Sequence, residues 1–299
     1  MLYRNKYETK KSGTSNEPYA LEGFEHLREY PDMKRAYEIF SDLVELPTNQ
    51  FILCNGGENA VKNTLLAIKP KNMFFSYPTW GMLDVYCEAL NINPIRSEMI
   101  VGENGDVYED EEYFYMLDGI DCFYSCCGIN NYISYNPITN LGNCWKIFDL
   151  TYYDWHSIKS WVCDLDSEKK IIVGSFDKML GCGIRLGFAI FPRQFNDRFQ
   201  LQREQFLNYS ACQILEYLKT NPEVLLRSSL QDRANKYWDT CLPAQIYKDD
   251  IVTKTNNYIT FRGDLNLNVP STKFQIDDHE FTRIGISYWY LIILFIKSR

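Results

Sequence analysis

The sequence predicts an α/β protein with a small second domain at its C-terminal end. Two observations support this prediction. Between residues 33 and 218, short apolar runs such as 51–54 and 171–173 alternate with segments of helical period. Beyond residue 250 the pattern changes to the alternation of short strands, as in 257–262 and 273–276. The first pattern indicates a layered α/β unit, and the second a smaller β-rich one.

Composition narrows the function classes. The 299 residues are 45% hydrophobic and 15% aromatic, enough for a large buried core. The formal net charge is -8, and the clearest charge run, residues 109–112, is acidic. A protein of this charge without a basic face is not expected to bind nucleic acid generally. We interpret the acidic run as the solvated start of a helix.

Ten cysteines are scattered through apolar segments of a chain whose first residues contain no apolar signal core. We therefore expect reduced thiols and a cytoplasmic location. Three histidines and the absence of paired CxxC motifs argue against a zinc site, so no metal is expected. The most hydrophobic run, residues 288–296, is shorter than the roughly 20 residues that span a bilayer, so no membrane association is expected.

The first half of the chain contains a possible anion site. A helix is predicted from about residue 32 to Leu46, and Pro47 ends it. The strand 51–54 then enters a glycine turn, Gly56-Gly57, before the next helix. The free N–H groups and the dipole of a helix start favour a phosphate. Glycines also make ordinary tight turns, and both interpretations stay open from this turn alone.

The stretch 171–192, IIVGSFDKMLGCGIRLGFAIFP, concentrates the residues most suited to chemistry. Two β-rich runs flank a turn with four glycines, Ser175, Lys178 and Arg185. A lysine whose charged form is disfavoured by neighbouring cations can attack an aldehyde, while serine and arginine supply donors for a phosphate. The alternative is a surface loop with a solvated lysine.

Three further side chains have chemical potential. Asp149 ends an apolar strand, where a carboxylate is costly without a cationic partner. Trp80 offers a flat face for stacking. Arg283 lies in a β-rich apolar run and can bind a carboxylate through two parallel hydrogen bonds. A capping aspartate, a core tryptophan and an edge-strand arginine are the alternatives.

The stretch around Lys178 closely resembles the lysine motif of fold-type-I pyridoxal-phosphate aminotransferases of class I/II, particularly the histidinol-phosphate aminotransferase-like branch. The resemblance implies a large domain with a mostly parallel central sheet sandwiched by helices, plus a small α+β C-terminal domain. It also implies that Lys178 bonds covalently to the cofactor, pyridoxal 5'-phosphate, and acts as the catalytic residue. Ser175 and Arg185 would hold the cofactor phosphate.

Other segments resemble the family's cofactor contacts in the family's order. In the family, a similar strand, glycine turn and helix start bind the cofactor phosphate. An aromatic residue in a segment that resembles YPTWGM stacks on the cofactor ring. Asn136 lies in SYNPITN, where Asn140 replaces the usual glycine. It and Tyr152 of DLTY would contact the phenolic oxygen of the cofactor. Asp149 of DLTY would contact the ring nitrogen. The residues so implied are Gly57, Glu58, Asn59, Trp80, Asn136, Asp149 and Tyr152.

The resemblance also implies one residue that binds the substrate and one that contacts a partner subunit. The family's C-terminal arginine strand is similar to FTRIGI, which implies that Arg283 binds the substrate carboxylate or its acidic counterpart. A family tyrosine that reaches the partner's cofactor phosphate is matched by Tyr30 in EYPD, which implies a homodimer.

The expected organisation is an N-terminal arm and first helix (1–47), a large cofactor-binding domain (48–218) and a small C-terminal domain (219–299). Helices are also expected at 194–218 and 223–242, for packing rather than chemistry.

We therefore expect an aminotransferase that moves an amino group between a small-molecule amino donor and a 2-oxo acid. A decarboxylase or lyase on the same scaffold, a non-catalytic relative that binds the cofactor, and a phosphate-binding α/β protein without it are the alternatives.

Overall fold

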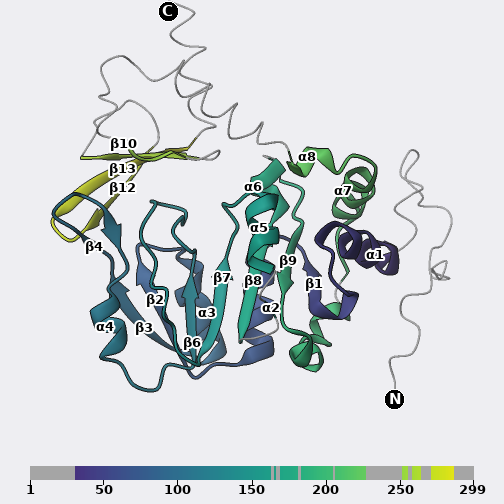
Figure 1. Cartoon of the computed structure of the whole chain (residues 1–299), viewed down its shortest axis with the longest axis horizontal. Coiled ribbons are helices and arrows are strands. Elements are labelled where there is room, and N and C mark those ends of the chain that lie inside the picture. Colours follow the sequence, from purple (N-terminus) through teal and green to yellow (C-terminus); the bar gives the residue numbers. More distant parts are fainter. Residues whose placement is uncertain are drawn as a thin grey trace, which may run out of the picture.

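The computed structural model describes residues 31–162, 165, 169–180, 183–204, 206–226, 251–254, 258–263 and 271–285. Its centre is a seven-stranded sheet in the order β1-β9-β8-β7-β6-β2-β3 (Figure 1). These strands are β1 (Phe51–Cys54), β2 (Asn72–Tyr77), β3 (Asn93–Glu98), β6 (Cys122–Ser125), β7 (Trp145–Asp149), β8 (Lys170–Ser175) and β9 (Gly187–Ile190).

All neighbouring pairs from β3 to β8 are parallel, whereas β9 is antiparallel to both β8 and β1. The sheet is therefore mostly parallel, as the resemblance implied. Its register sets Asp149 on β7 opposite Val173 on β8. The carboxyl ends of β7 and β8 consequently lie side by side at the same end of the sheet.

Helices cover both faces of this sheet. Side chains of each strand alternate between two apolar clusters: Phe51 and Leu53 of β1 face one, and Ile52 and Cys54 the other. The first cluster includes residues of α1 (Met33–Val44), α4 (Glu111–Tyr115), α5 (Trp155–Val162), α6 (Phe176–Leu180), α7 (Tyr209–Thr220) and α8 (Glu223–Leu226). The second includes residues of α2 (Gly57–Ile68), α3 (Met82–Leu90) and the 3-10 helix Arg193–Phe199.

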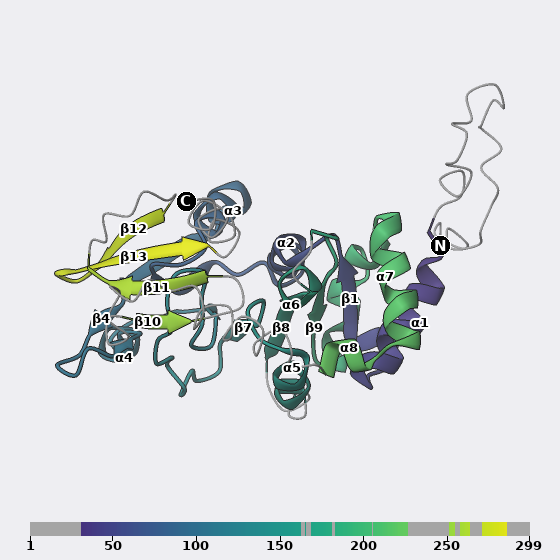
Figure 2. The ribbon, with the colours of Figure 1, turned by 90° about the horizontal axis from the view of Figure 1, so that it is seen from above.

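The expected first helix is present. Asp32 caps α1 by accepting a hydrogen bond from the backbone N–H of Arg35 at 3.0 Å. Apolar side chains at helical spacing bury the inner face of α1 in the first cluster. Figure 2 shows α1 and α7 packed together at the β1 edge of the sheet, and Arg35 and Glu216 form a bidentate ion pair between them.

A four-stranded antiparallel sheet forms the second β unit. Its order is β10-β11-β13-β12, with β10 (Ile251–Lys254), β11 (Tyr258–Arg262), β12 (Ser271–Ile276) and β13 (His279–Gly285). It lies at the same end of the large sheet as α6 (Figure 1). The loop after β6 joins it, because Tyr258 donates to the carbonyl of Asn130 at 2.5 Å and the backbone N–H of Ser134 donates to Thr253 at 2.7 Å.

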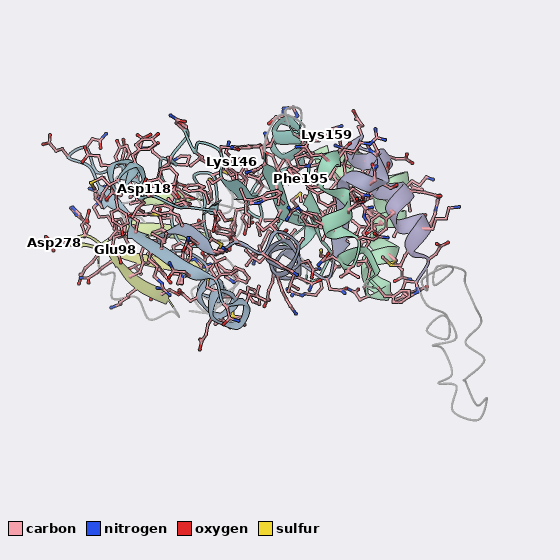
Figure 3. The ribbon with its side chains drawn as sticks, turned by 90° about the horizontal axis from the view of Figure 1, so that it is seen from below. Glu98, Asp118, Lys146, Lys159, Phe195 and Asp278 are labelled. Carbon is pink, nitrogen blue, oxygen red and sulfur yellow. The ribbon has the colours of Figure 1, made fainter. Side chains whose placement is uncertain are left out.

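A short hairpin of β4 (Ile100–Val101) and β5 (Val107–Tyr108) completes the strands. The backbone N–H of Val101 donates to Asp277 at 2.7 Å, which ties the hairpin to the turn between β12 and β13. In the view from below, Asp278 of this turn and Glu98 at the end of β3 lie at one end of the molecule, whereas Lys159 of α5 lies toward the other (Figure 3).

One of the two helix predictions for this part of the chain was wrong. The single helix expected at 194–218 is two 3-10 helices, Arg193–Phe199 and Gln202–Glu204, followed by α7. The helix is interrupted because Asn208 caps α7 at the N–H of Ala211 and is itself held by Asn55. The helix expected at 223–242 begins with α8, and its remainder lies outside the described residues.

The acidic run is only partly a solvated helix start. Asp110 caps α4 as expected, but Glu109 is 4% exposed. Its carboxylate accepts hydrogen bonds from the N–H of Ile138 and the hydroxyl of Ser125. Burial raises the pKa of Glu109 to about 7, against the lowering effect of these bonds.

Among the described residues, the cysteines form no disulfide, and no helix is both long and apolar enough to cross a bilayer.

The packing of β9 against the turn before α2 generates a stability prediction. A Cβ on Gly187 would lie 2.7 Å from the nitrogen of Gly57 and closer still to the carbonyl of Gly56. Gly187→Ala is expected to lower the free energy of unfolding by about 2 kcal/mol or more, measured by urea titration, because backbone must move.

Gly81→Ala is the matched control, since Gly81 has helical dihedral angles and nothing within 4 Å of its Cβ position. Its effect is expected to stay within about 0.5 kcal/mol. Equal stability of the two variants would contradict the close approach at Gly187.

Candidate active site

Lys178 lies at the carboxyl end of the large sheet, in the short helix α6 that follows β8 directly. Its Nζ is 5.8 Å from the centre of the Tyr152 ring. Burial lowers the pKa of Lys178, and the positive charges of Arg283 and Arg185 lower it further, while Asp177 opposes them. A larger fraction of uncharged amine makes this lysine a better nucleophile toward a carbonyl.

Asp149 is the last residue of β7 and lies at the same carboxyl end of the sheet. The hydroxyl of Tyr124 donates to its Oδ2 at 2.6 Å, and the backbone N–H of Thr151 donates to its Oδ1 at 2.9 Å. Burial raises the pKa of Asp149, and the hydrogen bonds from Thr151 and Tyr124 counteract this rise. A carboxylate held in this way favours a cationic partner, such as a protonated ring nitrogen.

The start of α2, residues 56–59, forms a backbone cradle beside Ser175, Thr151 and Arg185. Gly56 has φ of 90°, and no side chain caps the helix. A Cβ on Gly57 would lie 3.2 Å from both Ser175 Cβ and Thr151 Oγ1, and a Cβ on Gly56 would lie 2.8 Å from Cζ of Arg185. Strand β8, the loop after β7 and the helix start therefore converge on one point.

The donors of the cradle are largely backbone. The N–H groups of Gly57, Glu58 and Asn59 occupy the first turn, where no intrahelical acceptor exists. The side chain of Asn59 instead accepts from the N–H of Asn55 at 3.3 Å and so holds the turn. The hydroxyl oxygen of Ser175 accepts from the N–H of Asp177 at 3.2 Å, which leaves its proton to donate. Such donors at a helix start suit a phosphate.

Arg185 borders the cradle with a guanidinium that is about half exposed. It lies 3.6 Å from a carboxylate oxygen of Glu58 and 3.8 Å from one of Asp177. Its backbone N–H also donates to Asp177 at 2.7 Å. Arg185, for which the resemblance implied phosphate binding, thus lies at the start of α2 with two carboxylates beside it.

Arg283 on β13 reaches the same region from the small sheet. Its guanidinium carbon lies 4.7 Å from the centre of the Tyr258 ring, and that ring meets Tyr152 edge-on at 5.6 Å. Nε of Arg283 is buried and has no hydrogen-bond partner among the described residues. Burial lowers the pKa of Lys178, and the positive charge of Arg283 lowers it further. Burial raises the pKa of Tyr152, and the charge of Arg283 opposes that rise.

Trp80 is half-buried and is linked to Glu58 of α2 through Tyr86. Its ring lies 5.8 Å from that of Tyr86, whose hydroxyl donates to Glu58 at 2.9 Å. Trp80 therefore connects to the first turn of α2 through two residues.

Asn136 is placed differently. It is exposed, and its backbone bonds with Val107 and Glu109 rather than with any residue of the site. Tyr30 lies outside the described residues.

Sequence reasoning missed four side chains. Tyr124 and Thr151 bond Asp149, Asp177 contacts Arg185, and Asn131 has a buried Oδ1 without a hydrogen-bond partner among the described residues. Asn131 follows Asn130, which binds the carbonyl of Pro78 and the hydroxyl of Tyr258. Its position shortly after β6, at the carboxyl edge of the sheet, is the sequence signal that could have identified it.

Within the described residues, no cluster of histidine, cysteine and acidic side chains is arranged to hold a metal ion.

Solved structures of other proteins share the fold described above, whereas comparisons of the sequence found no match. No family model and no curated protein matches the chain. Among solved structures, the histidinol-phosphate aminotransferase of Clostridium acetobutylicum matches with a TM-score of 0.64 and 14% identity over 86% of this chain and 85% of that one. A putative aminotransferase of Burkholderia pseudomallei gives 0.67 and 14% over 87% and 85%. The L-threonine-O-3-phosphate decarboxylase of Porphyromonas gingivalis gives 0.59 and 14% over 90% of both chains.

The chain therefore has the fold of these fold-type-I pyridoxal-phosphate enzymes, which confirms the predicted fold class. At such low identity the likeness establishes the architecture, and the chemistry rests on the residues described above.

The surroundings of Lys178 generate a pH prediction. Arg283→Gln is expected to raise the pKa of Lys178, because the variant removes a positive charge that disfavours the ammonium form. The pKa is expected to stay below the ordinary lysine value, since burial is the larger cause. Competitive labelling with acetic anhydride over a pH series, read by mass spectrometry, measures it.

Arg262→Gln, on the neighbouring strand β11, is the control of equal charge change. An unchanged or lowered Lys178 pKa in Arg283→Gln would show that Arg283 does not act on the amine.

Proposed function

We propose that this protein is a pyridoxal-phosphate-dependent aminotransferase that moves an amino group between an amino acid, or a related amine, and a 2-oxo acid. One observation carries the proposal: a half-buried lysine, a half-buried aspartate and the glycine turn before α2 lie at the same end of the large sheet. A surface loop with a solvated lysine does not account for this combination.

The residues of the site fit the cofactor. The N–H groups of residues 57–59, Ser175 and Arg185 would hold its phosphate, as argued from the uncapped start of α2. Asp149 would hold the protonated ring nitrogen, and Lys178 would bond to the aldehyde carbon. When bound, the cofactor supplies an electron sink for the bonds at the substrate α-carbon.

Around the ring, Trp80 would cover one face and Tyr152 would contact the phenolic oxygen. The resemblance assigns a further contact to Asn136. Because Asn136 is exposed and bonded to β5, whereas Asn131 has a buried, unpartnered amide oxygen, we propose Asn131 for that contact instead.

The chain's own side chains then have distinct tasks. Lys178 would act as the base that takes a proton from the substrate α-carbon, a role for which its lowered pKa suits it. Asp149 would stabilise the protonated form of the cofactor's ring nitrogen. The aromatic rings of Tyr152 and Tyr258 limit water access beside Lys178.

Arg283 is the proposed substrate anchor. Its Nε is buried without a partner, and its guanidinium lies above Tyr258 within the same group of side chains as Lys178. A planar guanidinium with an unused donor suits a substrate carboxylate. The substrate class is therefore an amino acid or a similarly acidic amine.

A decarboxylase or lyase is the second candidate. One solved structure with this fold is a threonine-phosphate decarboxylase that is matched over 90% of both chains. Such an enzyme would use the same cofactor contacts and differ in which substrate bond is broken. A non-catalytic cofactor-binding protein is the weaker alternative, because Lys178, Asp149 and Arg185 are all present.

Assembly and location complete the proposal. We propose a homodimer in which Tyr30 contacts the partner's phosphate, and a cytoplasmic enzyme acting on small molecules.

The covalent assignment has a direct test. Borohydride reduction after incubation with pyridoxal 5'-phosphate is expected to attach the cofactor to Lys178, as measured by peptide mass spectrometry. Lys178→Ala is expected to abolish this labelling, whereas Lys62→Arg, an exposed lysine on α2, retains it. Labelling spread over surface lysines with Lys178 unmodified would refute the proposal.

The reaction class is tested by incubating the loaded protein with a panel of amino acids and identifying the products. A transaminase is expected to yield the 2-oxo acid and, with a 2-oxo acid acceptor, a new amino acid. Release of carbon dioxide with an amine product would instead identify a decarboxylase.

A further inference from the structure

Asp177 engages Arg185 at two points. Its carboxylate accepts the backbone N–H of Arg185 at 2.7 Å and lies 3.8 Å from the guanidinium. Arg185 has φ of 57°, and this backbone bond fixes the turn that aims its side chain at the cradle. Asp177 therefore belongs to the anion site by geometry, although it carries the same sign of charge as the anion.

The position of Asp177 makes its charge effective. The side chain is 14% exposed, so water screens it less than a surface carboxylate. It sits between Ser175 and Lys178 in sequence, and its charge raises the pKa of Lys178. The same field repels an anion placed at Ser175 and Arg185.

A carboxylate oxygen of Glu58 also lies 3.6 Å from the guanidinium of Arg185. The Glu58 side chain is 41% exposed and receives a hydrogen bond from Tyr86. Its charge is therefore better screened than that of Asp177. Arg185 therefore lies near two carboxylates, those of Asp177 and Glu58, in the absence of a ligand.

We propose that Asp177 is a specificity-determining residue that weakens the binding of phosphate dianions in this cradle, with Glu58 as a smaller contributor. The inference rests on the proposed function of the cradle. A phosphomonoester must share Arg185 with Asp177, so its phosphate adds less to binding than the donors alone would provide. The ring contacts and Lys178 then carry a larger share of cofactor affinity.

The test uses probes that lack an aldehyde, so that no covalent bond forms. Inorganic phosphate, pyridoxine 5'-phosphate and pyridoxine are titrated calorimetrically into the full chain and into Asp177→Asn. The asparagine keeps an oxygen for the N–H of Arg185 and loses the charge. Asp177→Asn is expected to bind both phosphate probes about tenfold more tightly and pyridoxine unchanged.

Asp42→Asn is the matched control, since Asp42 is an exposed residue of α1 and the variant changes the net charge equally. It is expected to leave all three affinities unchanged. Glu58→Gln is expected to tighten phosphate binding by a smaller factor than Asp177→Asn.

Unchanged or weaker phosphate binding by a folded Asp177→Asn would overturn the inference and would show that the carboxylate acts by positioning Arg185. Urea unfolding of each variant checks the fold. This outcome differs from failure of the proposed function, which would appear as absence of cofactor on Lys178 in the wild-type chain.

Discussion

The contact of Gly187 with the peptide between Gly56 and Gly57 is the constraint on which the site depends. It brings β9 against the turn before α2 at a separation that no side chain at position 187 would allow. Because β9 also pairs with β8, the uncapped start of α2 is set beside Ser175 at the end of β8. The anion cradle is thus a consequence of backbone packing.

The remainder of the site consists of cationic and acidic side chains that lie close together. Lys178, Arg185 and Arg283 bring positive charge to a place where Asp149, Asp177 and Glu58 bring negative charge. Burial of the amine and of Asp149 shifts both pKa values toward the neutral forms. A ligand that carries both a protonated nitrogen and an anionic group satisfies Asp149 and the cradle together.

The sequence predicted the elements that carry local signals. Short apolar runs placed β1 and β7, and the turn between β8 and β9 was identified from its glycines, lysine and arginine. Asp149 was found because it ends an apolar run. Arg283 was found because a charged residue interrupts a β-rich segment.

The missed features depend on contacts distant in sequence. Asn208 ends the expected long helix through its bonds with Asn55, some 150 residues away. Glu109 is buried because the loop after β6 folds over it and supplies the N–H of Ile138. Asn131 and Asn136 both lie in that loop, and local sequence does not decide which amide oxygen is buried and which side chain is exposed.

The most direct test of the account is a crystal structure of the full chain soaked with pyridoxal 5'-phosphate. The account predicts electron density that is continuous with Nζ of Lys178, with the phosphate at the N–H groups that begin α2 and the ring nitrogen at Asp149. Cofactor bound at any other place, with Lys178 unmodified, would contradict it.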